Sequence, residues 1–301
     1  MSNFNKVANL TRLLACSAEE QKTYPPVNLA LLPTFVHRNL RDDPLVDEKG
    51  YPSYNKPYSV MAWLETRPPL PDGVDEFVLM TDADMVFREP VDPRAYGAAR
   101  GVVISAEYTY LVGTANGFAK RFIAEDLIPK LAQVPFPTHP ASAPAPPATQ
   151  ADYARLPVTP SPLWSQVGGF HIFHTEDLRK IAPLWLNYTK QVRAFGDKEP
   201  ETFYSESMSA LGPGEEGLKA VRMKQSRWHS EMYGYVFAAA AVGVTHHTRR
   251  DVMLYPGYKP WLARAPKILH YGSDYTVSHQ DGGTGSVYFN KMAQVSAARS
   301  A

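Results

Sequence analysis

Short apolar runs alternate along this chain with longer segments in which apolar residues recur at helical spacing. The run from Phe77 to Met80 is too short for a helix and follows the charged pair Asp75-Glu76, so it predicts a fully buried strand. Further strands are predicted at 101–105, at 168–174 after a turn made by two glycines, at 243–248 and, as the last strand of the chain, at 267–272.

Helices are predicted where apolar residues recur every three or four positions. Pro57 suits the first position of a helix over roughly 58–65, because proline lacks the N–H that a helix start leaves unpaired. Thr175 is a suitable N-cap for a helix that Pro183 kinks or restarts. Two further helices are predicted, a short one at 11–15 and an amphipathic one at 118–131.

A small-residue helix is predicted from Ser230, as its N-cap, to Ala241, which places Glu231 in the first turn. The connecting segments are an irregular stretch at 23–54 with at most one short strand near 29–35, a Pro/Ala-rich surface loop at about 134–162, and a polar, mobile loop at 196–224. These elements predict an α/β fold in a single domain over residues 1–301.

The composition excludes some functions without choosing among the rest. The net charge is +1 and no dense Lys/Arg stripe is visible, so nothing indicates nucleic acid or a membrane surface as the partner. The single Cys16 excludes an intrachain disulfide framework and a cysteine-built metal site. The longest strongly apolar run, 235–244, is too short to cross a membrane, so no membrane anchor is predicted in this chain.

Asp82 and Asp84 follow the predicted strand 77–80 directly. In extended backbone two side chains at i and i+2 point the same way, and the carboxyl end of a strand is where open α/β sheets bind ligands. The pair therefore predicts an all-oxygen half-site for Mg²⁺ or Mn²⁺, completed by water and phosphate. A strand that runs into a turn capped by two aspartates explains the same residues equally well.

Three other positions each have a structural and a functional interpretation. Gly168-Gly169 is either a tight turn or a place where backbone approaches a sugar or phosphate closely. Glu231 is either a helix-dipole partner or a carboxylate within a polar-aromatic wall that suits a saccharide. His270, at the end of the last predicted strand, is either a structural histidine or a ligand.

Seven segments in this order resemble one family. They are LTRLLAC (10–16), YNKPYSVMAWLE (54–65), FVLMTDADMVFREPVDP (77–93), VGGFHIFHTEDLRKIAPLWL (167–186), SEMYGYVFAA (230–239), MLYPGY (253–258) and ILHYG (268–272). The chain resembles the plant and green-algal peptidyl-serine α-galactosyltransferases and, more distantly, the hydroxyproline O-arabinosyltransferases. So many ordered segments are far more specific than the two aspartates alone.

The resemblance implies a GT-A glycosyltransferase, that is, a Rossmann-like α/β domain with a central mixed sheet that uses a UDP-sugar and Mn²⁺, or Mg²⁺ in its place. It implies that Asp82 and Asp84 bind the metal and that His270 is the third ligand. The metal would bridge the donor phosphates and neutralise charge as UDP leaves. The family also implies the lumen of the endoplasmic reticulum or Golgi as the location.

The remaining site residues are expected around the donor. Asn55 and Lys56 are candidates for diphosphate or ribose contacts, and Gly168 and Gly169 would let the backbone approach the donor sugar. Glu231 is the candidate catalytic carboxylate near the anomeric carbon. It would stabilise or attack that carbon in a retaining enzyme, which the galactosyltransferase resemblance favours, or deprotonate the acceptor in an inverting one.

The expected reaction is transfer of galactose from UDP-galactose to serine in Pro/Hyp-rich, extensin-like proteins. Arabinosyl transfer to hydroxyproline is the alternative that Ile181-Ala182-Pro183-Leu184-Trp185 favours. Only nine residues precede Leu10, whereas family members usually begin this domain with an upstream strand that helps to hold the uracil. The sequence therefore predicts a domain that lacks its first strand. A truncated, non-catalytic glycan- or peptide-binding module is the alternative from another class.

Overall fold

A computed structural model gives the fold, and it describes residues 12–15, 34–40, 43, 51–82, 84–108, 121–123, 158–161, 167–207, 227–249, 251–255, 265–272, 275–278 and 286–289. The strands are β1 (Arg12–Ala15), β2 (Thr34–His37), β3 (Phe77–Met80), β4 (Met85–Phe87), β5 (Val102–Glu107), β6 (Val158–Ser161), β7 (Val167–His174), β8 (Thr245–Arg249), β9 (Met253–Leu254), β10 (Ile268–His270), β11 (Tyr275–Ser278) and β12 (Ser286–Phe289). The α-helices are α3 (Asn55–Glu65), α7 (Thr175–Lys198), α8 (Pro200–Ser207) and α10 (Ser230–Val242), and the 3-10 helices are η2 (Pro52–Tyr54), η3 (Arg94–Tyr96) and η5 (Arg227–His229).

The largest sheet has five strands in the order β3-β7-β5-β8-β6. Strand β7 runs antiparallel to both β3 and β5, β5 runs parallel to β8, and β6 is antiparallel to β8. The predicted α/β class and the central mixed sheet are therefore confirmed. A Rossmann-like GT-A arrangement remains a prediction.

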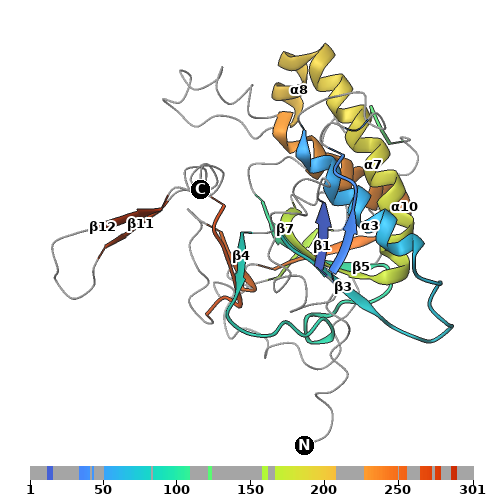
Figure 1. The fold of residues 1–301 in the computed structure, drawn as a ribbon, viewed down its shortest axis with the longest axis vertical. Helices are drawn as coiled ribbons and strands as arrows, with labels where there is room; N and C mark the ends of the chain where they lie inside the picture. Colours follow the sequence, from blue (N-terminus) through green and yellow to red (C-terminus); the bar gives the residue numbers. More distant parts are fainter. Residues whose placement is uncertain are drawn as a thin grey trace, which may run out of the picture.

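The helices α3, α7 and α10 lie together beside this sheet (Figure 1). The α10 helix packs along α7, and Tyr235 of α10 contacts the sheet through the ring of His171, with the ring centroids 4.3 Å apart. At the crossing of the two helices, Gly234 faces the backbone of Thr189, where a Cβ atom would lie 2.7 Å from the Thr189 nitrogen. The absence of a side chain at Gly234 is what lets the two helices approach this closely.

A second sheet has the order β4-β10-β9 and begins directly after the two aspartates. Strand β10 lies between an antiparallel neighbour, β4, and a parallel neighbour, β9. The chain thus passes from the edge strand of the large sheet into the small sheet within four residues, 81–84, and the aspartates occupy this crossing point.

Several predicted elements differ from the structure in type or extent. Residues 12–15 form a strand instead of a helix, because they pair in parallel with β2, and long-range pairing outweighs local spacing. Strand β3 is half-buried throughout and not fully buried, since it is an edge strand of the described sheet. The predicted last strand, β10, is followed by β11 and β12, which pair with each other.

The predicted helix starts are each displaced by one or two residues. Helix α3 continues directly from η2, so Pro57 is its third residue; this is tolerated because the first four N–H groups of a helix have no intrahelical partner. His174 replaces Thr175 as the N-cap of α7, because the Thr175 hydroxyl donates to the Glu76 carbonyl instead. Likewise the Ser230 hydroxyl donates to the Arg227 carbonyl, and His229 is the N-cap of α10.

The predicted loops are shorter than expected where the structure describes them. Residues 158–161 of the Pro/Ala-rich loop form β6, and the first part of the predicted polar loop belongs to the end of α7 and to α8. Helix α7 runs through Pro183 without the predicted restart. The rest of both loops and most of the predicted helix 118–131 lie outside the described residues; 121–123 form a turn. No helix in the described part of the chain is long and apolar enough to cross a membrane.

The close crossing of α7 and α10 predicts that Gly234→Ala lowers the free energy of unfolding by roughly 1–3 kcal/mol, the usual cost of overpacking. Gly196→Ala in α7 is the matched control, because a Cβ there would meet Phe203 at an ordinary 3.4 Å. This control should be neutral or stabilising by up to about 1 kcal/mol, the helix-propensity gain of alanine over glycine. Urea denaturation measures both, and equal effects of the two substitutions would contradict the packing interpretation.

Candidate metal centre

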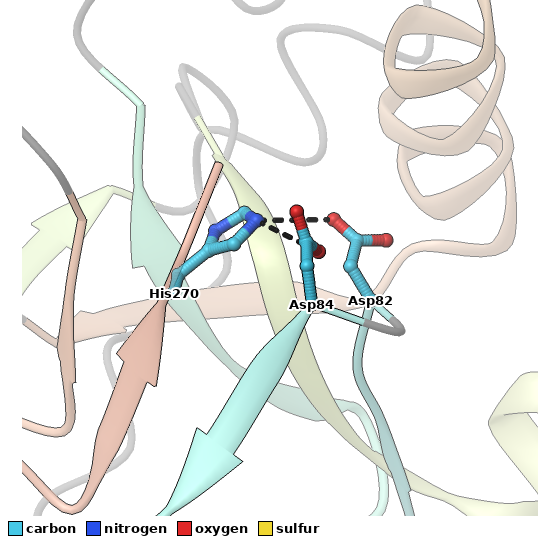
Figure 2. A group of neighbouring side chains, drawn as sticks. All are labelled: Asp82, Asp84 and His270. Carbon is cyan, nitrogen blue, oxygen red and sulfur yellow. Dashed lines mark ion pairs between the residues drawn. The ribbon is translucent and has the colours of Figure 1, made fainter. Parts of the chain in front are cut away.

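A turn between the two sheets places Asp82 and Asp84 side by side. Asp82 follows β3, Asp84 precedes β4, and the Met85 N–H donates to the Asp82 carbonyl over 3.2 Å. The prediction of extended backbone at the pair is therefore wrong, although the two carboxylates do lie on the same side (Figure 2). Their side chains are 22% and 19% exposed, so both are open to solvent and to a ligand.

The pairing of β10 with β4 brings His270 to the aspartates. His270 lies opposite Met85 in this antiparallel ladder, and the N–H of the next residue, Tyr271, donates to the Asp84 carbonyl over 2.9 Å. The His270 Nε2 atom lies 3.3 Å from Asp84 Oδ1 and 3.8 Å from Asp82 Oδ2 (Figure 2). The three predicted metal ligands thus converge, although nearly two hundred residues separate His270 from the aspartates.

This donor set fits a divalent cation. One ligand atom from each of the three residues lies within 4.8 Å of the other two. Adjacent ligand atoms in an octahedral Mg²⁺ site lie roughly 3 Å apart. The Nε2 atom of His270 lies 3.3 Å from Asp84 Oδ1, which is close to this spacing. Two carboxylates and an imidazole suit Mn²⁺, and two carboxylates with added water suit Mg²⁺.

Lys56 connects the aspartates to Glu231. Its Nζ atom lies 2.6 Å from Asp82 Oδ1 and 3.4 Å from Glu231 Oε2. Burial lowers the pKa of Lys56, but the negative charges of Glu231 and Asp82 outweigh burial and raise that pKa above its ordinary value. With the three carboxylates ionised, one ammonium leaves the cluster two negative charges in excess, a balance that a dication would neutralise.

Glu231 is buried and firmly placed. Its N–H donates to the Tyr51 hydroxyl over 3.0 Å, and its carbonyl accepts from the Trp185 indole over 2.9 Å. Burial raises the pKa of the Glu231 carboxyl, and the Lys56 charge opposes this rise. The indole of Trp228, three residues earlier, is 54% exposed and lies edge-on to Tyr51. Tyr233 and Tyr235, which the prediction placed in the same polar-aromatic wall, are instead buried in the core.

Two groups of residues that were predicted to contact the UDP-sugar contact other parts of the protein in the structure. The Asn55 amide accepts from the Leu40 N–H and donates to Asn39, each over 2.8 Å, so it ties the segment 38–40 to the start of α3. Gly168 and Gly169 lie inside β7 and not in the predicted turn. An added Cβ at either would collide with Tyr108, at 2.7 Å from its hydroxyl in the case of Gly169.

Sequence reasoning missed Tyr108, which follows β5 and is buried against these glycines. Its hydroxyl lies 3.0 Å from the Nδ1 atom of His270. The sequence could not have identified Tyr108, because the strand directions that bring it to the aspartates are known only from the structure. Strands β3 and β5 are both antiparallel to β7, so their carboxyl ends share the sheet edge at which Asp82 lies.

The sequence is similar to two groups of glycosyltransferases. The Hydroxyproline O-arabinosyltransferase family N-terminal domain matches residues 2–135. A peptidyl serine alpha-galactosyltransferase of Arabidopsis thaliana is 33% identical over 272 residues, 90% of this chain and 27% of that protein. The enzyme of the same name from Chlamydomonas reinhardtii is 31% identical over 264 residues, 88% of this chain and 30% of that protein.

Hydroxyproline O-arabinosyltransferase 3 of Arabidopsis thaliana is 28% identical over 252 residues, 82% of this chain and 51% of that protein. The chain therefore spans less than a third of the two galactosyltransferases and about half of this arabinosyltransferase. No solved structure matches the chain.

The converged ligand set predicts that Asp84→Asn abolishes Mn²⁺ binding, because an amide oxygen carries no net charge to hold the cation. The fold should persist, since the substitution also removes one of two neighbouring like charges. Asp72→Asn, at an exposed turn position, is the matched control. Calorimetric titration with Mn²⁺ measures affinity and thermal unfolding measures the fold; wild-type Mn²⁺ affinity in Asp84→Asn would remove this residue from the metal site.

Proposed function

We propose that this chain, which is similar in sequence to the peptidyl serine alpha-galactosyltransferases and the hydroxyproline O-arabinosyltransferases, is a metal-dependent transferase. It would move galactose from UDP-galactose to serine in Pro/Hyp-rich proteins. The observation that supports this best is the convergence of Asp82, Asp84 and His270 in one cluster that Lys56 extends to Glu231. We place this activity in the secretory pathway, where such acceptor proteins are made.

The donor diphosphate binds at the acidic end of the cluster. A divalent cation held by Asp82, Asp84 and His270 supplies charge neutralisation as UDP departs. Lys56 pairs with Asp82 in the protein alone, over 2.6 Å. If a cation neutralised the charge of Asp82, the Lys56 ammonium would be able to contact a phosphate oxygen and would add a second positive charge at the leaving group.

Glu231 acts at the other end of the cluster, near the anomeric carbon. An α-linked product from an α-linked nucleotide donor requires retention, so its carboxylate faces the developing oxocarbenium-like centre and stabilises or attacks it. Contacts of its own backbone with Tyr51 and Trp185 fix the residue in place. Lys56, at 3.4 Å, favours the ionised carboxylate that this role needs.

Arabinosyl transfer to hydroxyproline is the second candidate, and the match of residues 2–135 to the arabinosyltransferase domain favours it. Both candidates require the same metal and a UDP-sugar donor. They differ in the sugar and in the acceptor side chain.

The enzyme class is tested by calorimetry with UDP and Mn²⁺, alone and together. We expect each to increase the affinity for the other, because Asp82, Asp84 and His270 would hold the cation where it would neutralise the charge of the diphosphate. If neither ligand affects the binding of the other, the transferase proposal for this chain fails, and a non-catalytic glycan- or peptide-binding module is the remaining interpretation. EDTA-treated protein is the control for metal carried over from purification.

The donor and acceptor are tested by incubating the protein with a panel of UDP-sugars and with Ser-Pro and Ser-Hyp peptides. Galactose transfer to serine, detected by mass spectrometry, is the expected result. Arabinose transfer to hydroxyproline would replace the first candidate with the second. Ala-Pro and Ala-Hyp peptides are the controls that lack the acceptor hydroxyl.

Glu231→Gln should leave UDP and Mn²⁺ binding intact and lower the transfer rate by roughly two to four decades, as expected for the loss of a carboxylate that acts in the transition state. The matched control is Glu65→Gln, which is exposed at the end of α3. Transfer at the wild-type rate in Glu231→Gln would limit Glu231 to the role of a helix-dipole partner.

A further inference from the structure

Tyr108 is buried, with 1% of its surface exposed, yet its hydroxyl reaches the metal centre. It lies 3.0 Å from Nδ1 of His270, the ring nitrogen on the far side from the aspartates. The ring of Tyr255 packs against Tyr108 at 5.3 Å and against His270 at 4.9 Å, measured between ring centroids. His270 is thus held by a hydroxyl on Nδ1 and by an aromatic ring on its side.

We propose that Tyr108 is the positioning residue that fixes the ring of His270, and that the lack of side chains at Gly168 and Gly169 lets Tyr108 reach it. This inference rests on the proposed metal-dependent function. A histidine that ligates through Nε2 must carry its proton on Nδ1, because the Nε2 lone pair is then free for the cation. The Tyr108 oxygen accepts that Nδ1–H, as the outer partners of metal-bound histidines do.

A hydroxyl suits this position better than a backbone carbonyl. Before a cation binds, Nε2 faces the Asp84 carboxylate at 3.3 Å and is best satisfied as a donor, which leaves Nδ1 as an acceptor. The Tyr108 hydroxyl donates to Nδ1 in that tautomer and accepts from it in the other. The same contact therefore holds the ring in place with and without the cation, whereas a carbonyl could only accept.

The two glycines make this contact sterically feasible. Gly168 lies so close to the Tyr108 ring that any Cβ would overlap it, and Gly169 faces the hydroxyl and the Met253 side chain, at 2.7 and 2.8 Å from an added Cβ. Gly169 also has φ +74, which a side chain disfavours. The register of β5 on β7 also shifts at this place, because Ser105 pairs with His171 and the next residue, Ala106, pairs with Gly168.

The test compares Tyr108→Phe with Tyr235→Phe in titrations with Mn²⁺ alone, followed by the electron paramagnetic resonance signal of the free ion. Both substitutions remove one buried hydroxyl that contacts a histidine, but Tyr235 contacts His246, away from the aspartates. We expect Tyr108→Phe to weaken Mn²⁺ binding by about 10–100-fold, the usual effect of losing an outer partner of a metal ligand. Tyr235→Phe should leave Mn²⁺ affinity unchanged.

Thermal unfolding of the same proteins separates positioning from general stability. A purely structural role for Tyr108 would lower the melting temperature of Tyr108→Phe and leave its Mn²⁺ affinity at the wild-type value, which would overturn the inference alone. Absence of Mn²⁺ binding in the wild-type protein would overturn the metal assignment and this inference with it. Gly168→Ala, which displaces the ring without removing the hydroxyl, should reproduce the weakened Mn²⁺ binding of Tyr108→Phe.

Discussion

The antiparallel pairing of β10 with β4 is the constraint on which the candidate site depends. Strand β4 starts one residue after Asp84, and the register places His270 opposite Met85. A slip of one residue would turn the imidazole to the other face of the small sheet. Main-chain hydrogen bonds, including the bond from the Tyr271 N–H to the Asp84 carbonyl, therefore determine whether three ligand atoms meet.

Electrostatics then organises the residues around that meeting point. Three carboxylates close together are costly to hold in a folded protein unless cations compensate them. Lys56, in the first turn of α3, compensates part of this negative charge because its ammonium contacts both Asp82 and Glu231. The charge that remains is one that a dication would neutralise. A single lysine thus links the metal end of the cluster to the carboxylate proposed for catalysis.

Close packing fixes the positions of the side chains in the site. Tyr108 reaches His270 only because β7 has glycine at two consecutive positions, and Glu231 is fixed by Tyr51 and Trp185 through its own backbone. The sequence pattern indicated that the glycines permit a close approach. The approaching group is a tyrosine ring of the same protein, which no local pattern could identify, because Tyr108 lies about sixty residues earlier in the chain.

The sequence by itself determined the α/β class, strand β3 and the helix that carries Glu231, and through family resemblance it named the three candidate metal ligands. Each of these depends on the local spacing of residues or on short sequence motifs, which can be recognised without knowledge of the fold. Only the tertiary structure decided that 12–15 is a strand, that Asn55 ties down the segment 38–40, and that Lys56 joins Asp82 to Glu231. These features depend on contacts between residues far apart in the chain, and such contacts are set by strand register and helix packing, which leave no periodic signal in the sequence.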